Sequence, residues 1–214
     1  LKNRQPDGMS TPLIKLLKRG LGNVYSILVN KINGSDAAFS LNTYLSFKDL
    51  LRLSWKFRQL PVLPNFAKVK NTKVDLEMRK WQLETSGNSD FEYFVRNIIP
   101  SQIPVSYLEG YSFLLQKSKS MPWPRSPAVI FTSNSYSSDE IFKIYAAEKI
   151  KNKTPLVIGQ HGGHYGSGKL SFVEDHQIKI SNSYLSWGWS NKHQPKVKPV
   201  GLIIPIKPAT VGLR

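Results

Sequence analysis

The segment between residues 128 and 159 constrains the fold of this chain more than any other. It contains two short apolar runs, at 128–132 and 155–159, with the length and composition of buried strands. Between them, Ser137 and Glu140 have the spacing of a capping box and predict a helix that runs to about residue 150. A strand, a helix and a second strand within roughly thirty residues predict a βαβ unit with a right-handed crossover and a parallel sheet.

The rest of the pattern divides the chain in two at residues 120–127, where three prolines predict a connector. Before this connector, helical spacing of apolar residues predicts helices at 12–32, 41–59, 76–83, 90–99 and 104–116. Gly20 and Gly22 leave two interpretations of the first stretch, one broken helix or two short ones. After the connector, residues 184–189 and 197–202 are further strand candidates.

We therefore predict an α/β fold, a Rossmann-like parallel sheet with flanking helices preceded by a mostly helical region. The predicted parts are a helical region at 1–125, the Rossmann-like βαβ region at 126–202 and a linker at 203–214.

The formal net charge of +16 implies an anionic partner or surface. Nucleic acid, an anionic membrane leaflet and anionic substrates such as nucleotide sugars all fit, although scattered basic residues are also typical of solvated helix faces. The chain has no cysteine, which agrees with a cytoplasmic location. It has no run of about 20 apolar residues, so we expect no membrane-spanning segment.

Residues 160–168, Gln-His-Gly-Gly-His-Tyr-Gly-Ser-Gly, follow the second apolar run directly. Ligands of parallel sheets bind at the carboxyl ends of the strands, and glycines there let backbone N–H groups approach a phosphate. His161 is a candidate general base or partner of a leaving phosphate, because an imidazole can accept a proton near neutral pH. A structural histidine bonded to a neighbouring strand is the alternative. The candidate substrate-binding residues of this loop are Gln160, Gly162, Gly163, His164 and Tyr165.

Ser133 and Asn134 leave the first predicted strand at the same edge. They can hydrogen-bond a sugar or phosphate, or act only as polar residues at the entry of the helix. Trp187 is a candidate platform for a sugar ring, with core packing as the alternative. His164 and Tyr165 either orient an acceptor or form a turn whose ring packs on Trp187.

Glu174 and His176 are the other two catalytic candidates. Glu174 can deprotonate an acceptor hydroxyl, or simply complement the positive end of a helix. His161, His164 and His176 with a carboxylate also have the ligand types of a zinc site. The surrounding glycines favour a flexible loop over a rigid cage, so we predict no metal.

Several of these motifs together resemble the transferases encoded in bacterial O-antigen and other surface-carbohydrate gene clusters. The matching sequence segments are Phe-Thr-Ser-Asn at 131–134, Val-Ile-Gly-Gln-His-Gly-Gly-His-Tyr-Gly at 157–166, Glu-Asp-His at 174–176 and Tyr-Leu-Ser-Trp-Gly-Trp at 184–189. Helical residues at 90–109 also look like this family, so the resemblance covers about 90–202.

The resemblance implies a GT-B-like glycosyltransferase or polyol-phosphate transferase that acts in surface-polysaccharide and cell-envelope biogenesis. It implies a nucleotide-sugar or nucleotide-polyol donor as substrate, a glycan or lipid-linked acceptor and no further cofactor. The donor nucleotide of such relatives sits mostly in a second Rossmann domain, so this chain is expected to hold the acceptor-side half and to be catalytically incomplete alone. The positive charge then favours a cytoplasmic protein with peripheral contact to the inner face of the membrane.

A basic nucleic-acid-binding module without catalysis is the alternative from another class. Lysine, arginine and aromatic residues favour it, but the chain contains no recognisable helix-turn-helix, RNA-recognition or zinc-finger pattern.

Overall fold

The computed structural model describes residues 12–34, 37–62, 72–84 and 89–202. In the first half of the chain its elements are α1 (Pro12–Asn33), β1 (Ala38–Leu41), α2 (Phe47–Lys56), η2 (Glu77–Arg79), α3 (Asp90–Gln102), η3 (Val105–Tyr107) and α4 (Tyr111–Ser120). In the second half they are β2 (Val129–Thr132), α5 (Ser135–Ser138), α6 (Glu140–Lys151), β3 (Leu156–Gly159), α7 (Phe172–Ile180), β4 (Ser183–Ser186) and β5 (Val197–Pro199). The predicted linker at 203–214 lies outside the described residues.

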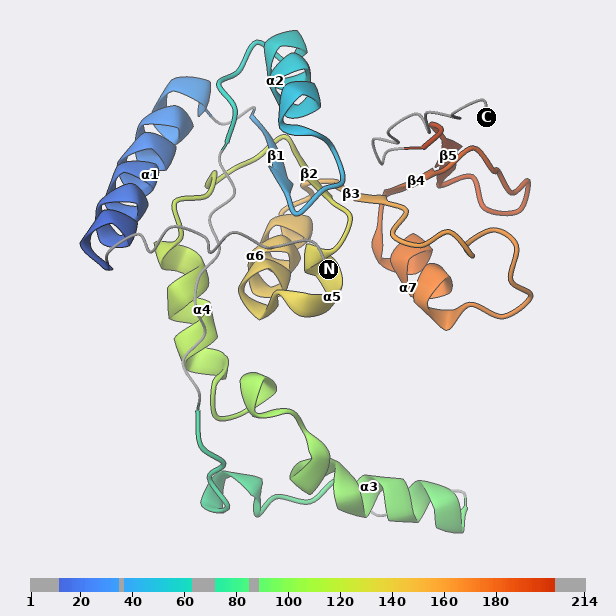
Figure 1. Ribbon diagram of the computed structural model, residues 1–214. Coiled ribbons are helices and arrows are strands. Elements are labelled where there is room, and N and C mark those ends of the chain that lie inside the picture. The colour runs from blue at the N-terminus through green and yellow to red at the C-terminus, as the bar shows by residue number, and fades with distance from the viewer. Residues whose placement is uncertain (1–11, 35–36, 63–71, 85–88, 203–214) are drawn as a thin grey trace, which may run out of the picture.

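Five parallel strands form one sheet in the order β1-β2-β3-β4-β5. Successive strands are neighbours, so every connection moves one position in the same direction along the sheet. Crossovers that share one hand place the helices that pack on the sheet on the same face. Figure 1 shows α6 and α7 together on one side of the sheet and α2 on the other. The predicted α/β fold with a Rossmann-like parallel sheet is confirmed.

The main core lies between the sheet and the helices α4, α6 and α7. Successive side chains of a strand point to opposite faces of the sheet. The side chains that point to this face are almost completely buried: Phe39, Leu41, Ile130, Leu156, Ile158 and Tyr184. From α6, Ile141, Phe142 and Tyr145 pack against them. On the opposite face, α2 and the sheet border an apolar groove of about 540 Å³.

The βαβ unit is present as predicted, but its helix begins at a different cap. Asp139 is the N-cap of α6, and its carboxylate accepts a hydrogen bond from the Phe142 N–H at 3.0 Å. The predicted cap, Ser137, lies instead in the short helix α5, where its hydroxyl donates to the Asn134 carbonyl at 3.0 Å. A carboxylate at this position also complements the positive end of the helix, which favours the later start.

The N-terminal region contains one strand that the sequence pattern does not predict. β1 pairs with β2 and extends the sheet, although its four residues, Ala-Phe-Ser-Leu, carry only two large apolar side chains. The helix expected at 41–59 is shorter, because the strand and a turn occupy its start. α1 is a single helix through Gly20 and Gly22, neither of which has a neighbouring segment within 4 Å of its Cβ position.

The described residues of the segment 72–110, called the arm below, extend away from the sheet, and α3 lies farthest from it (Figure 1). The helix predicted at 76–83 is wrong: only the single turn η2 forms there. The helix predicted at 104–116 is divided into η3 and α4. Among the described residues of the arm, every large hydrophobic side chain is at least partly exposed.

Candidate active site

Loops that follow β1, β2 and β3 meet at the carboxyl edge of the sheet. Because neighbouring strands run parallel and in register, Tyr44, Asn134 and His161 are brought to the same edge from distant parts of the chain. Asn134 and His161 are predicted site residues, whereas Tyr44 was missed. Its only sequence signal is its place just after β1, which is itself an unpredicted strand.

The Tyr44 hydroxyl connects the other two side chains. It donates a hydrogen bond to Asn134 Oδ1 at 3.2 Å and lies in hydrogen-bond contact with His161 Nδ1. The Tyr44 and His161 rings are also stacked, with an interplanar angle of 19°. The Tyr44 hydroxyl has one proton and therefore donates to only one of these two partners at a time. When it donates to Asn134, its oxygen accepts from an N–H at His161 Nδ1, and this tautomer carries the lone pair on Nε2.

In that tautomer, His161 Nε2 is a free proton acceptor at this edge. The residue is exposed, and no hydrogen bond to Nε2 is found within the part of the chain that the structure describes. An exposed imidazole in this tautomer can accept a proton from a hydroxyl that docks beside it. The alternative predicted role, a bond to a neighbouring strand carbonyl, does not occur in the described structure.

Gln160 holds the start of the glycine-rich loop. It is 1% exposed, its Oε1 accepts from the Trp187 N–H and from the Trp189 indole N–H, both at 2.8 Å, and its Nε2 donates to the Gly162 carbonyl at 2.6 Å. The amide thus ties the loop after β3 to the loop after β4. Its predicted contact with substrate stays a prediction.

The second half of the glycine-rich loop is fixed around Gly166. Its N–H donates to Glu174 Oε2 at 2.6 Å, from the first turn of α7. Gly166 has φ +79°, and a Cβ there would lie 2.5 Å from the Trp189 ring. Only glycine can adopt this positive φ and also leave room for the Trp189 ring without strain. Glu174 consequently orders this loop and also lies at the positive end of α7.

Tyr165 and His164 differ in exposure. Tyr165 is 5% exposed, its hydroxyl accepts from Gln177 Nε2 at 3.1 Å, and the His164 ring packs edge-on against it at 4.3 Å. His164 itself is exposed beside Gly162 and can contact a ligand. Gly163 lies next to the Trp187 ring.

Several hydroxyls under this edge are buried without a partner among the described residues. They are the side chains of Ser133, Ser135 and Tyr184. Burial raises the pKa of Tyr136 to about 12 and also raises the pKa of Tyr184, so both phenols stay neutral at physiological pH. Ser133 is a predicted substrate-binding residue, and its hydroxyl lies below the surface rather than on it.

The three predicted catalytic residues do not form one cluster. His161 is linked to Asn134 through Tyr44, whereas Glu174 lines a separate pocket of about 500 Å³ with Lys169 and His193. His176 is exposed on α7, and its ring lies 6.4 Å from the Tyr136 ring.

Within residues 12–34, 37–62, 72–84 and 89–202, no three His, Asp or Glu side chains are placed to hold a metal ion. The described helices include none that is long and apolar enough to cross a membrane.

A family of known proteins matches this chain. The sequence model of the LIC12162 family transferases matches residues 2–210. No curated protein and no solved structure matches the chain. The match covers almost the whole sequence and favours an enzyme over the nucleic-acid-binding alternative. The chain belongs to the LIC12162 family of transferases.

Proposed function

We propose that this transferase moves a glycosyl or polyol-phosphate group from a nucleotide-activated donor to a hydroxyl of a surface-glycan acceptor. The observation that carries the proposal is the Tyr44–His161 contact at the carboxyl edge, since it leaves Nε2 of an exposed histidine free to accept a proton. The GT-B-like arrangement and the O-antigen or related surface-polysaccharide pathway are part of this proposal.

In the proposed reaction, His161 Nε2 takes the proton of the acceptor hydroxyl as its oxygen attacks the donor. A new bond forms from that oxygen to the sugar carbon or to phosphorus, and the bond to the nucleotide phosphate breaks. The nucleotide leaves with the electron pair, and the imidazolium returns its proton to solvent. Tyr44 and Asn134 act as positioning residues, because they fix the tautomer that carries the lone pair on Nε2.

The remaining predicted residues have supporting roles in this proposal. Backbone N–H groups at Gly162 and Gly163 and the exposed His164 face the anionic part of a ligand. Glu174 and His176 are the alternative proton acceptors, and Trp187 is the proposed sugar platform. The net charge of +16 supports an anionic donor and a peripheral place at the inner membrane face.

The released nucleotide tests the reaction and its class. The purified full-length protein that contains this chain is incubated with uridine and cytidine diphosphate donors and with hydroxyl-bearing lipid-linked glycans, and products are separated by ion-exchange chromatography. Glycosyl transfer releases a nucleoside diphosphate, whereas polyol-phosphate transfer from a diphosphate donor releases a nucleoside monophosphate. Acceptor-dependent release of either supports the proposal, and release that is independent of every acceptor contradicts it.

His161→Ala should lower the rate by about 10²- to 10⁴-fold, the usual contribution of a general base. The rise in rate from acid to neutral pH that a general base gives the parent protein should be absent from His161→Ala.

Tyr44→Phe should lower kcat by about tenfold and change the pH–rate profile, because the phenol no longer holds one tautomer of His161. Tyr111→Phe, an exposed phenol on α4, is the matched control and should have no effect. A normal pH profile in Tyr44→Phe would contradict the positioning role.

A further inference from the structure

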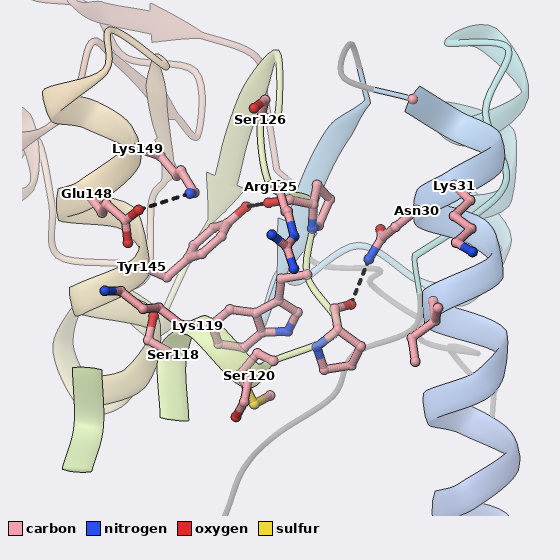
Figure 2. Close-up of a pocket in the computed structure, with 16 residues that line it drawn as sticks. Asn30, Lys31, Ser118, Lys119, Ser120, Arg125, Ser126, Tyr145, Glu148 and Lys149 are labelled. Carbon is pink, nitrogen blue, oxygen red and sulfur yellow. Dashed lines mark hydrogen bonds and ion pairs between the residues drawn. The ribbon is translucent and has the colours of Figure 1, made fainter. Parts of the chain in front are cut away.

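A second pocket lies at the opposite, amino-terminal edge of the sheet. It has a volume of about 970 Å³ and is bordered by α1, the connector before β2 and the end of α6 (Figure 2). The connector leads into β2 and α6 leads towards β3, so the pocket is separated from His161 by the length of the strands. Nothing in the proposed function uses it.

The charged side chains around this pocket are mostly cationic. Lys31, Lys119, Arg125 and Lys149 line it, against one carboxylate, Glu148. Lys149 lies 3.4 Å from Glu148, but the other three cations have no hydrogen-bond or ion-pair partner in the described residues. Figure 2 shows Arg125 on the connector, between Lys149 on α6 and Lys31 on α1. Three unpaired cations beside a pocket favour an anionic occupant.

The wall behind these charges is rigid. Trp123 is 4% exposed and packs against Phe39 and Tyr145, with ring centroids 5.6 and 5.1 Å away. Asn30 Nδ2 donates to the Pro122 carbonyl at 2.9 Å, and the Tyr145 hydroxyl donates to the Pro124 carbonyl at 2.7 Å. The backbone that carries Arg125 is therefore held on both sides of the pocket, and ordering it for a ligand requires little further loss of entropy.

Two polar atoms of this wall also lack partners. The Trp123 indole N–H and Asn30 Oδ1 are buried, and neither has a hydrogen bond in the part of the chain that the structure describes. A buried N–H without an acceptor is unfavourable.

We propose that this pocket binds a phosphate-bearing ligand. Phosphate groups accept several charge-assisted hydrogen bonds at once, which suits a guanidinium and three ammonium groups around one space. The volume is too large for a single bare ion and accommodates a phosphate ester with an organic body, which the apolar wall of Trp123 and Met121 can contact. The source is either a soluble phosphate ester or a phospholipid headgroup. A lipid is one of the two because Ile27, which lines the pocket, is 50% exposed, and Leu28 and Ile32 on the same helix are exposed as well.

Titration calorimetry of the 214-residue chain with inorganic pyrophosphate at about 0.1 M salt tests the site. We expect saturable binding that the double variant Lys119→Gln/Arg125→Gln weakens by about tenfold or more. Both side chains are exposed and unpaired, so the variant should fold normally, which its melting temperature checks. The matched control, Lys48→Gln/Lys56→Gln, removes two exposed charges from α2 and should change binding less than about twofold.

Equal weakening in the two double variants, or no binding by the parent chain, would overturn the proposal. Cosedimentation with phosphatidylcholine vesicles that contain about 30% phosphatidylglycerol then identifies the source. If the pocket variant loses vesicle binding and the α2 variant keeps it, the phosphate belongs to a lipid headgroup. If both variants sediment like the parent chain, the ligand is a soluble phosphate ester. Neither result depends on His161 or on transferase activity.

Discussion

The sheet region and the arm of residues 72–110 are stabilised by different interactions. Every hydrophobic residue of the main core belongs to β1 or to segments after the arm, so the sheet and its covering helices share one apolar interior. The described part of the arm contributes none of these residues, and Phe91 and Phe94 on α3 are more than half exposed. The arm therefore needs another source of order.

That source is a buried ion pair between Arg79 and Glu109. The two side chains are 8% and 4% exposed, and Arg79 Nε lies 2.7 Å from Glu109 Oε1. All five N–H groups of the guanidinium are used: two bond the carboxylate and three bond the carbonyls of Pro100, Ser101 and Ile103 at the end of α3. The network joins η2, α3 and the segment before α4. A core of many contacts loses stability gradually, whereas an arm held by one network opens when either partner is removed.

The largest expected loss of global stability is in the sheet. Ile130→Ala removes a side chain that is 0% exposed on the interior strand β2, and should lower the free energy of unfolding by about 2–5 kcal/mol in urea titrations. The control Val157→Ala, on the half-open face of β3, should cost about 1 kcal/mol. Amide exchange in the arm under native conditions should not change. Equal losses in the two variants would mean that both sheet faces are equally packed.

An intermediate loss is expected in the loop at the carboxyl edge. Gly166→Ala combines a positive φ with a Cβ only 2.5 Å from the Trp189 ring, and should cost about 1–3 kcal/mol by thermal unfolding. Gly168→Ala is the matched control, because its Cβ would have only ordinary contacts at 3.8 Å and should change stability by less than about 0.5 kcal/mol. If Gly168→Ala is the more damaging variant, the loop is not held at Gly166.

The same contrast explains how much of the fold was predictable. Residues 128–132 and 155–159 are continuous apolar runs that end in polar or glycine-rich loops, so local sequence was sufficient for β2, β3 and the position of His161. β1 is too short and too polar for such a signal, and Tyr44 depends on it. The contact of Tyr44 with Asn134 spans 90 residues, and only the parallel pairing of β1 and β2 creates it.

The arm was predicted less well for a related reason. Apolar residues at helical spacing in 76–83 favour a helix only if a neighbouring surface buries them, yet Leu76 is 73% exposed and only the turn η2 forms. The ion pair that orders this segment joins residues 30 positions apart. Charged residues at such a separation give no local pattern in one sequence.

Glu109→Gln should have the smallest effect on global unfolding and the most localised structural effect. It leaves the Arg79 guanidinium buried without a counter-charge, so amides at the end of α3 should exchange many times faster and trypsin should cut the arm sooner. Urea unfolding of the sheet should hardly change. The control is Glu77→Gln, which breaks an exposed pair with Lys80 in the same arm and should alter neither measurement. A large fall in sheet stability would show that the two regions unfold together.

Acid should act on the arm as Glu109→Gln does. Hydrogen bonds from Arg79 lower the pKa of Glu109 to about 2, whereas in an open arm this carboxyl has its ordinary pKa of about 4.3. Because the folded-state pKa is the lower one, the carboxylate stabilises the arm fully above about pH 4.3, and this contribution is lost as the pH falls towards about 2. The Arg79 Nε–H resonance and α3 amide exchange should follow that decline in the parent chain. In Glu109→Gln both should be independent of pH over this range apart from the titration of other carboxyls, so parallel acid curves for the two proteins would show that a different group orders the arm.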